Sequence, residues 1–147
     1  MKKNPTALDV IGIPTEEEEQ IQVFRWAHAM RGRWPELRLL FHVPNGGSRG
    51  RIEAVKFKQA GVKAGVPDLF LPAPKGEYHG LFIEMKRRKG GRVSEDQKLW
   101  IKELRQNGYR VEVCKGWNEA VEVLEDYLRG HMKRGEGHVS NGHAAGV

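Results

Sequence analysis

Two apolar runs in the middle of the chain carry charged residues where a buried strand should carry none. They occupy residues 66–71 and 81–86. Because alternate side chains on a strand share a face, Glu84 and Lys86 project together, away from the leucine, isoleucine and methionine of the same run. If the two strands pair, Asp68 comes near both. Two carboxylates and an ammonium in an otherwise apolar sheet are a conflict typical of functional sites, and a metal ion would resolve it.

Composition limits the kind of protein. A chain of 147 residues with 39% hydrophobic residues fits one domain with a modest core. A formal charge of +6 favours polyanionic partners, although charge alone does not establish nucleic-acid binding. With no run of about 20 apolar residues and no signal-peptide pattern, the protein is expected in the cytoplasm. The single cysteine, Cys114, excludes an internal disulfide, and its apolar neighbours predict a buried thiol.

The pattern along the chain predicts an alternation of helices and strands. Thr15 and Ser94 are good helix N-caps, and residues 94–97 have the form of a capping box. The expected elements are a helix that Thr15 starts and Gly32 ends, a strand at 37–43, a helix at 52–60, strands at 66–71 and 81–86, a helix from Ser94 that Asn107 ends, a strand at 109–115 and a helix at 117–128.

This order predicts an α/β fold with a small mixed sheet flanked by helices. The sheet is mixed because the turn-rich segment 72–80 joins its neighbouring strands in a hairpin-like connection. Residues 1–14 are expected to be an extended lead-in, residues 15–128 the domain, and residues 129–147 a disordered tail.

The spacing of the charged residues resembles a known nuclease pattern. Pro67-Asp68 is followed after fifteen residues by Glu84-Met85-Lys86, as in the PD-(D/E)xK nuclease superfamily. Further residues stand in the order found in the VRR-NUC (virus-type replication-repair nuclease) family, namely Glu16 with Gln20, Pro44-Asn45-Gly46-Gly47, Gly65-Val66 and Ser94-Glu95-Asp96-Gln97. The resemblance covers residues 15–128, is to the stand-alone phage and bacterial form, and implies a restriction-endonuclease-like core.

The residue types suit phosphodiester hydrolysis. The reaction needs a hard divalent cation, and Mg²⁺ prefers one or two carboxylates together with water and phosphate. Asp68 and Glu84 are those carboxylates, and Lys86 is placed to orient or deprotonate the attacking water or to neutralise developing charge. The resemblance implies Mg²⁺ or Mn²⁺ as cofactor, with the carbonyl of Met85 as a further ligand. The alternative is a buried ion-pair cluster without catalysis.

Two more side chains are candidates with open alternatives. Glu16 is the expected helix-borne acid of the site and metal ligand, but Glu17, Glu18 and Glu19 crowd the same turn. Glu19 is its main competitor, and all four could merely satisfy the helix dipole. Gln97 could point into the site and hydrogen-bond water or phosphate. As a capping-box residue it would turn back to Ser94 instead.

Basic and glycine-rich loops are the candidate DNA contacts. The loop after the first strand offers Asn45, Arg49 and Arg51, against the alternative of a plain turn. The loop beyond Lys86 offers Arg87, Arg88, Lys89 and Arg92, against the alternative of a solvated loop. His42 could neighbour the site, although a lone strand histidine is more often structural.

The residues and the resemblance together predict a metal-dependent DNA endonuclease of the bacterial or phage-infected host cytosol. The resemblance adds a preference for branched DNA such as four-way junctions, and a homodimer. Two alternatives remain at this point: a catalytically silent nucleic-acid-binding module, and a sequence-specific restriction-type endonuclease.

Overall fold

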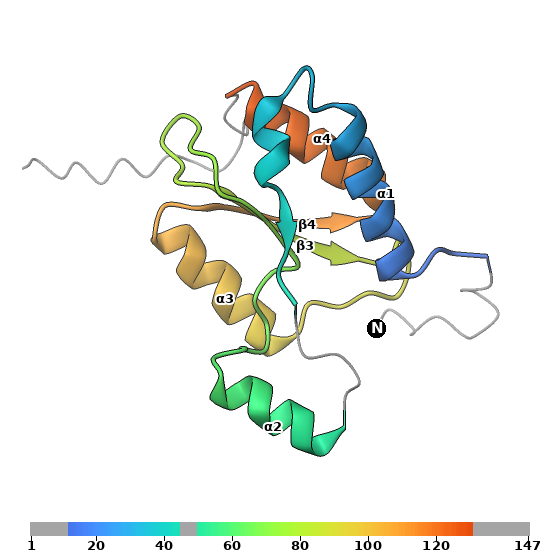
Figure 1. Cartoon of the computed structure of the whole chain (residues 1–147), viewed down its shortest axis with the longest axis vertical. Coiled ribbons are helices and arrows are strands. Elements are labelled where there is room, and N and C mark those ends of the chain that lie inside the picture. The colour runs from blue at the N-terminus through green and yellow to red at the C-terminus, as the bar shows by residue number, and fades with distance from the viewer. Residues whose placement is uncertain (1–11, 45–49, 131–147) are drawn as a thin grey trace, which may run out of the picture.

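A four-stranded sheet forms the middle of the molecule in the computed structural model, which describes residues 12–44 and 50–130 (Figure 1). The strands lie in the order β1 (Phe41–His42), β2 (Leu69–Leu71), β3 (Leu81–Lys86) and β4 (Arg110–Lys115). The β1–β2 and β2–β3 pairs are antiparallel, whereas β3 and β4 are parallel. The predicted mixed sheet is confirmed.

Helices cover both faces of this sheet (Figure 1). They are α1 (Glu16–Ala29) and α4 (Trp117–Leu128) on one face and α3 (Glu95–Gln106) on the other, whereas α2 (Arg51–Gln59) lies away from the sheet. The odd-numbered side chains of β3, such as Ile83, join a core cluster with residues of α1 and α4. On the opposite face Phe82 packs in a second cluster with Ile101 of α3. Strand β3 is therefore buried on both faces, which makes the charges of Glu84 and Lys86 costly.

Local hydrogen bonding explains where two of the helices begin. Thr15 accepts the N–H of Glu18 at 3.2 Å, and Glu18 accepts the N–H of Thr15 at 2.7 Å. Ser94 and Gln97 form the same reciprocal pair, at 3.2 and 2.9 Å. Both predicted caps are confirmed. Each stabilises the start of its helix, because it gives a partner to N–H groups that have none within the helix.

The predicted strand at 37–43 is wrong for most of its length. Residues 35–39 form a 3₁₀-helix, η2 (Pro35–Leu39), and only Phe41 and His42 are strand. Leu37 and Leu40 are buried whereas Leu39 and Phe41 are exposed, so the buried positions recur every three residues rather than every two. Pro35 favours the helical turn because its ring fixes φ near the helical value.

The remaining boundaries agree with expectation to within a few residues. Cys114 is 1% exposed, as predicted for a core thiol. Of the expected lead-in the structure describes only residues 12–14, and of the expected tail only residues 129 and 130. Among the helices of the described part of the chain, none is long and apolar enough to cross a membrane.

A buried carboxylate ties α1 to two distant segments. Glu19 is fully buried and accepts the backbone N–H of Trp117, at 2.7 Å, and the Nε–H of Arg88, also at 2.7 Å. Because Gly116 has no side chain to cap α4, Glu19 supplies that cap from α1. Burial by itself would raise the pKa of Glu19, but Arg88 and the Trp117 N–H outweigh it and hold that pKa below its ordinary value.

Replacing Glu19 should therefore destabilise the fold. We expect Glu19→Ala to lower the free energy of unfolding by about 2 kcal/mol, because the Trp117 N–H loses its acceptor and a cavity forms. The matched control is Glu17→Ala, an exposed residue of the same turn, with a change within about 0.5 kcal/mol. Urea denaturation followed by circular dichroism measures both, and equal midpoints for the two variants would contradict the assignment.

Candidate active site

Strand pairing brings the two predicted carboxylates together. In the β2–β3 ladder Leu69 pairs with Ile83, so continuing the register by one residue places Asp68 opposite Glu84. The Asp68 carboxylate accepts the backbone N–H of Met85 at 2.7 Å. Its half-buried side chain is thereby fixed to β3 just where the charged part of that strand begins.

The main chain of Asp68 is held from the other side by β1. Its carbonyl oxygen accepts the N–H of Val43 at 2.7 Å and lies 2.8 Å from Nδ1 of His42. His42 therefore supports the backbone of Asp68 rather than approaching its carboxylate. This outcome agrees with the structural alternative expected of a lone histidine on a strand.

Glu84 is the most constrained side chain of the group. It is 1% exposed, and its Oε1 accepts Nε2–H of Gln97 at 2.8 Å and lies 3.4 Å from Nζ of Lys86. Its second oxygen, Oε2, is buried and has no hydrogen-bond partner among the described residues. A buried oxygen without a partner costs free energy unless something else binds it.

The electrostatics of the group follow from this burial. Burial raises the pKa of Glu84 to about 8, and the neighbouring Asp68 acts in the same direction. Lys86, only 7% exposed, opposes the rise but does not cancel it. Two neighbouring carboxylates thus have one buried ammonium beside them, so a further cation would be favourable here.

Gln97 forms the capping box and also points into the site, where its bond is to Glu84; its contact with water or phosphate stays a prediction. Its Oε1 accepts the N–H of Ser94 in the capping box, while its Nε2–H group donates to Glu84. The two ends of one amide therefore connect the start of α3 to the β3 carboxylate. Sequence reasoning missed that Ser94 orients the Gln97 amide in this way, although the capping-box pattern was visible.

The structure does not bring Glu16 to the carboxylate pair. Within residues 12–44 and 50–130, no group of three or more His, Cys, Asp or Glu side chains is arranged to hold a metal ion. Glu16 is the half-exposed first residue of α1, and its competitor Glu19 is bound by Arg88 and Trp117. The ligand role predicted for the Met85 carbonyl stays a prediction, because only the N–H of Met85 has a described contact with the pair.

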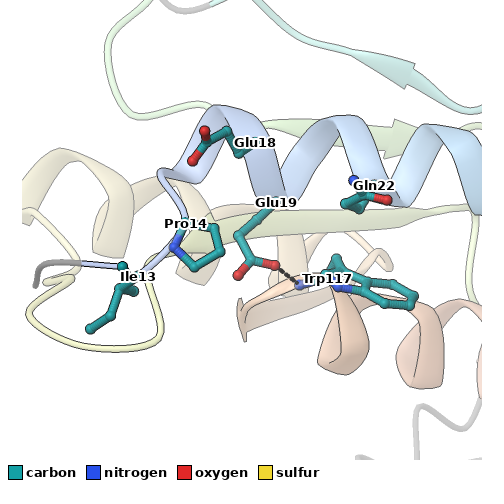
Figure 2. A pocket seen from close by; sticks show the side chains of 7 residues that line it. Ile13, Pro14, Glu18, Glu19, Gln22 and Trp117 are labelled. Atoms are coloured by element: carbon teal, nitrogen blue, oxygen red, sulfur yellow. Dashed lines mark hydrogen bonds between the residues drawn. The ribbon is translucent and has the colours of Figure 1, made fainter.

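A cavity of about 760 Å³ lies beside Glu19 (Figure 2). Its lining includes Pro14, Glu18, Gln22 and Trp117, with the Glu19 carboxylate turned toward the start of α4. None of Asp68, Glu84 or Lys86 contributes to it. Both oxygens of Glu19 already accept hydrogen bonds, so the buried carboxylate of this cavity has no unsatisfied oxygen for the expected chemistry.

The predicted DNA-contacting residues divide into three groups. Arg87 donates to the carbonyl of Ile13 at 3.1 Å, and Arg88 pairs with Glu19, so both have structural partners that the sequence did not reveal. Lys89, Arg92 and Arg51 are exposed, and their DNA contacts stay a prediction. The remaining two candidates, Asn45 and Arg49, lie outside the described residues.

Comparisons with known proteins agree with this geometry. A model of the VRR-NUC domain family matches residues 8–118. A solved structure described as a VRR_NUC domain protein is similar with a TM-score of 0.69 and 35% sequence identity, covering 80% of this chain and 91% of that chain. A search of curated proteins found no match. Because the family model spans most of the chain and the structural likeness comes with substantial identity, the chain belongs to the VRR-NUC family and contains a nuclease domain.

Proposed function

We propose that the protein is a metal-dependent DNA endonuclease that hydrolyses phosphodiester bonds at the Asp68–Glu84–Lys86 group. The observation that carries this proposal is the buried, unpartnered Oε2 of Glu84 opposite Asp68. A purely structural ion pair would match one carboxylate with one ammonium and would satisfy the oxygens of both partners. Here a second carboxylate is added and an oxygen is left over, which is the arrangement expected around a cation.

The donor set fits Mg²⁺ or Mn²⁺. Hard divalent cations prefer oxygen ligands, and Mg²⁺ needs only one or two carboxylates because water and substrate phosphate complete its shell. Asp68 and Glu84 would hold the ion, with the Met85 carbonyl as a third oxygen. When bound, the ion supplies charge stabilisation to the phosphate undergoing attack. Glu16 has no comparable support, and the proposal does not depend on it.

Lys86 acts on the reacting groups from the same face of β3 as Glu84, and Gln97 of α3 positions Glu84. The Lys86 ammonium lies 3.4 Å from the Glu84 carboxylate and is shielded from solvent, so its charge is screened little. It is placed to orient the attacking water or to neutralise charge on the phosphate. Gln97 holds Oε1 of Glu84 in place, which leaves Oε2 free to bind the ion.

We further propose that the substrate is branched DNA, such as a four-way junction, cut by a homodimer. Each chain provides one Asp68–Glu84–Lys86 group, and resolving a junction requires two symmetric incisions, which a two-fold dimer supplies. The charge of +6 suits a DNA substrate. Exposed aliphatic and aromatic side chains, Ile21, Leu39, Phe41 and Leu99 among them, offer apolar surface to a partner subunit.

Removing the charged groups should abolish cleavage. We expect Asp68→Asn, Glu84→Gln and Lys86→Ala each to lower the cleavage rate at least about 1,000-fold, or about 4 kcal/mol, in the presence of Mg²⁺ or Mn²⁺. Glu95→Gln, which neutralises an exposed carboxylate of α3, is the matched control and should cleave at the wild-type rate. Labelled linear, flap, single-stranded and four-way DNAs measure the rates. Near wild-type cleavage by the Asp68 or Glu84 variant would refute the site.

The raised pKa of Glu84 predicts an unusual pH dependence of stability without metal. Its ordinary pKa of 4.5 applies in the unfolded chain and a pKa of about 8 in the fold, so between these values the folded state binds more protons. Stability should therefore fall as pH rises from about 5 to 8, by on the order of 3 kcal/mol. Denaturation in EDTA should show this fall in the wild type but a flatter profile in Glu84→Gln. Identical profiles for the two proteins would contradict the raised pKa of Glu84 in the folded state.

Substrate preference and subunit number are tested together. We expect light scattering to show a dimer at micromolar protein concentration, and cleavage of a four-way junction at least about tenfold faster than of a linear duplex with the same arm sequences. A monomer with equal rates on both substrates would overturn this part of the proposal. The assignment of the nuclease site would stand in that case, because it depends on each chain separately.

A further inference from the structure

Helix α2 stands apart from the rest of the fold (Figure 1). No Cα atom of α2 lies within 8 Å of one in any other described helix or strand, and no residue of α2 is buried. Two aliphatic side chains on it are strongly exposed, Ile52 at 75% and Val55 at 56%. A nine-residue helix with so little support from packing is marginal by itself, so an external partner is expected to stabilise it.

The basic side chains of α2 and its two strongly exposed aliphatic side chains gather on one face. With 3.6 residues per turn, Ile52 and Val55 lie in the middle of an arc flanked by cationic residues. We call this the α2 face, and it comprises Arg51, Ile52, Val55, Lys56, Lys58 and Gln59. Glu53 and the half-buried Phe57 lie on the opposite side. The α2 face therefore carries three positive charges, no acid and an aliphatic centre.

The connection from α2 leads directly to the candidate active site. Gly65 has a φ of +90°, and a Cβ atom there would lie 2.6 Å from the backbone carbon of Asp96. Only glycine allows this close approach without strain. Asp96 precedes Gln97, and Gly65 precedes Asp68 by three residues. The contact thus holds Gly65, in the segment that follows α2, against the start of α3. Both neighbouring site residues, Asp68 and Gln97, lie close to it in sequence.

We propose that the α2 face binds the DNA substrate beside the bond to be cut. This inference rests on the proposed function and extends it to a second contact surface. Arg51, Lys56 and Lys58 contact backbone phosphates, while Ile52 and Val55 pack against sugar carbons. Charge favours DNA over a second copy of the chain, since a two-fold interface through the α2 face would oppose two sets of three cations with only two aliphatic residues on each side.

The direct test is DNA binding measured without metal, so that it does not depend on cleavage. The test variant combines Arg51→Gln, Lys56→Gln and Lys58→Gln. The matched control removes the same charge from the exposed residues Arg25, Arg31 and Arg33, at the end of α1 and in the turn that follows. Fluorescence anisotropy with a labelled duplex and a four-way junction, in EDTA at several salt concentrations, gives affinity and its salt dependence.

We expect the α2 variant to bind at least about tenfold more weakly, with the slope of log K against log salt reduced by about 2 to 3. Its unfolding midpoint should match the wild type, because α2 supports no other described element. Ile52→Ser with Val55→Ser should weaken binding about threefold or more with the slope unchanged. If the α2 variant matches the control in affinity and slope, the inference is overturned.

Two further outcomes distinguish DNA binding by the α2 face from dimerisation through it and from the nuclease activity itself. If Ile52→Ser with Val55→Ser converts a dimer to a monomer in light scattering without DNA, the α2 face is a subunit interface and the inference fails. If no metal supports cleavage by the wild type while the α2 variant still loses DNA binding, the nuclease proposal fails and the DNA contact stands.

Discussion

The burial of Glu84 is the constraint on which the site depends. A carboxylate in a strand that is covered on both faces loses its hydration, and a nearby Asp68 adds repulsion. The fold answers with three donors: the Met85 N–H for Asp68, and the Gln97 amide and the Lys86 ammonium for Glu84. These donors leave Oε2 of Glu84 unsatisfied. The proposed cation explains why the fold tolerates such a group, because the ion would supply the partner that the protein chain itself lacks.

The surrounding elements can be understood as supports for this pair. Strand β1 holds the main chain of Asp68, and the capping box of α3 orients the Gln97 amide. On the other face of the sheet, Glu19 joins α1 to the start of α4 and to the loop after β3. Hydrogen bonds from the fold therefore hold both site carboxylates, as preorganised electrostatic catalysis requires. The close approach of Gly65 to Asp96 holds the segment that leads to Asp68 against the start of α3.

The helix starts and the arrangement of the charged strand residues could be predicted from the sequence, because local rules determine them. The caps at Thr15 and Ser94 depend on neighbouring residues, and the shared face of Glu84 and Lys86 follows from strand geometry alone. The proximity of Asp68 required only that two neighbouring strands pair. Local rules failed at 37–43, where the apolar run Leu39-Leu40-Phe41 suits a strand by composition although tertiary packing buries every third residue. Local rules also could not predict which of Glu16 to Glu19 is buried. The buried one, Glu19, is bound by Arg88 and Trp117, which are distant in sequence.

The most direct test of the central claim is the position of a bound metal ion. Crystals of the protein soaked in Mn²⁺ should give an anomalous-scattering peak between the carboxylates of Asp68 and Glu84, and the Glu84→Gln variant should lack that peak under the same conditions. No peak at the pair under saturating Mn²⁺, or a peak only in the cavity beside Glu19, would contradict the account.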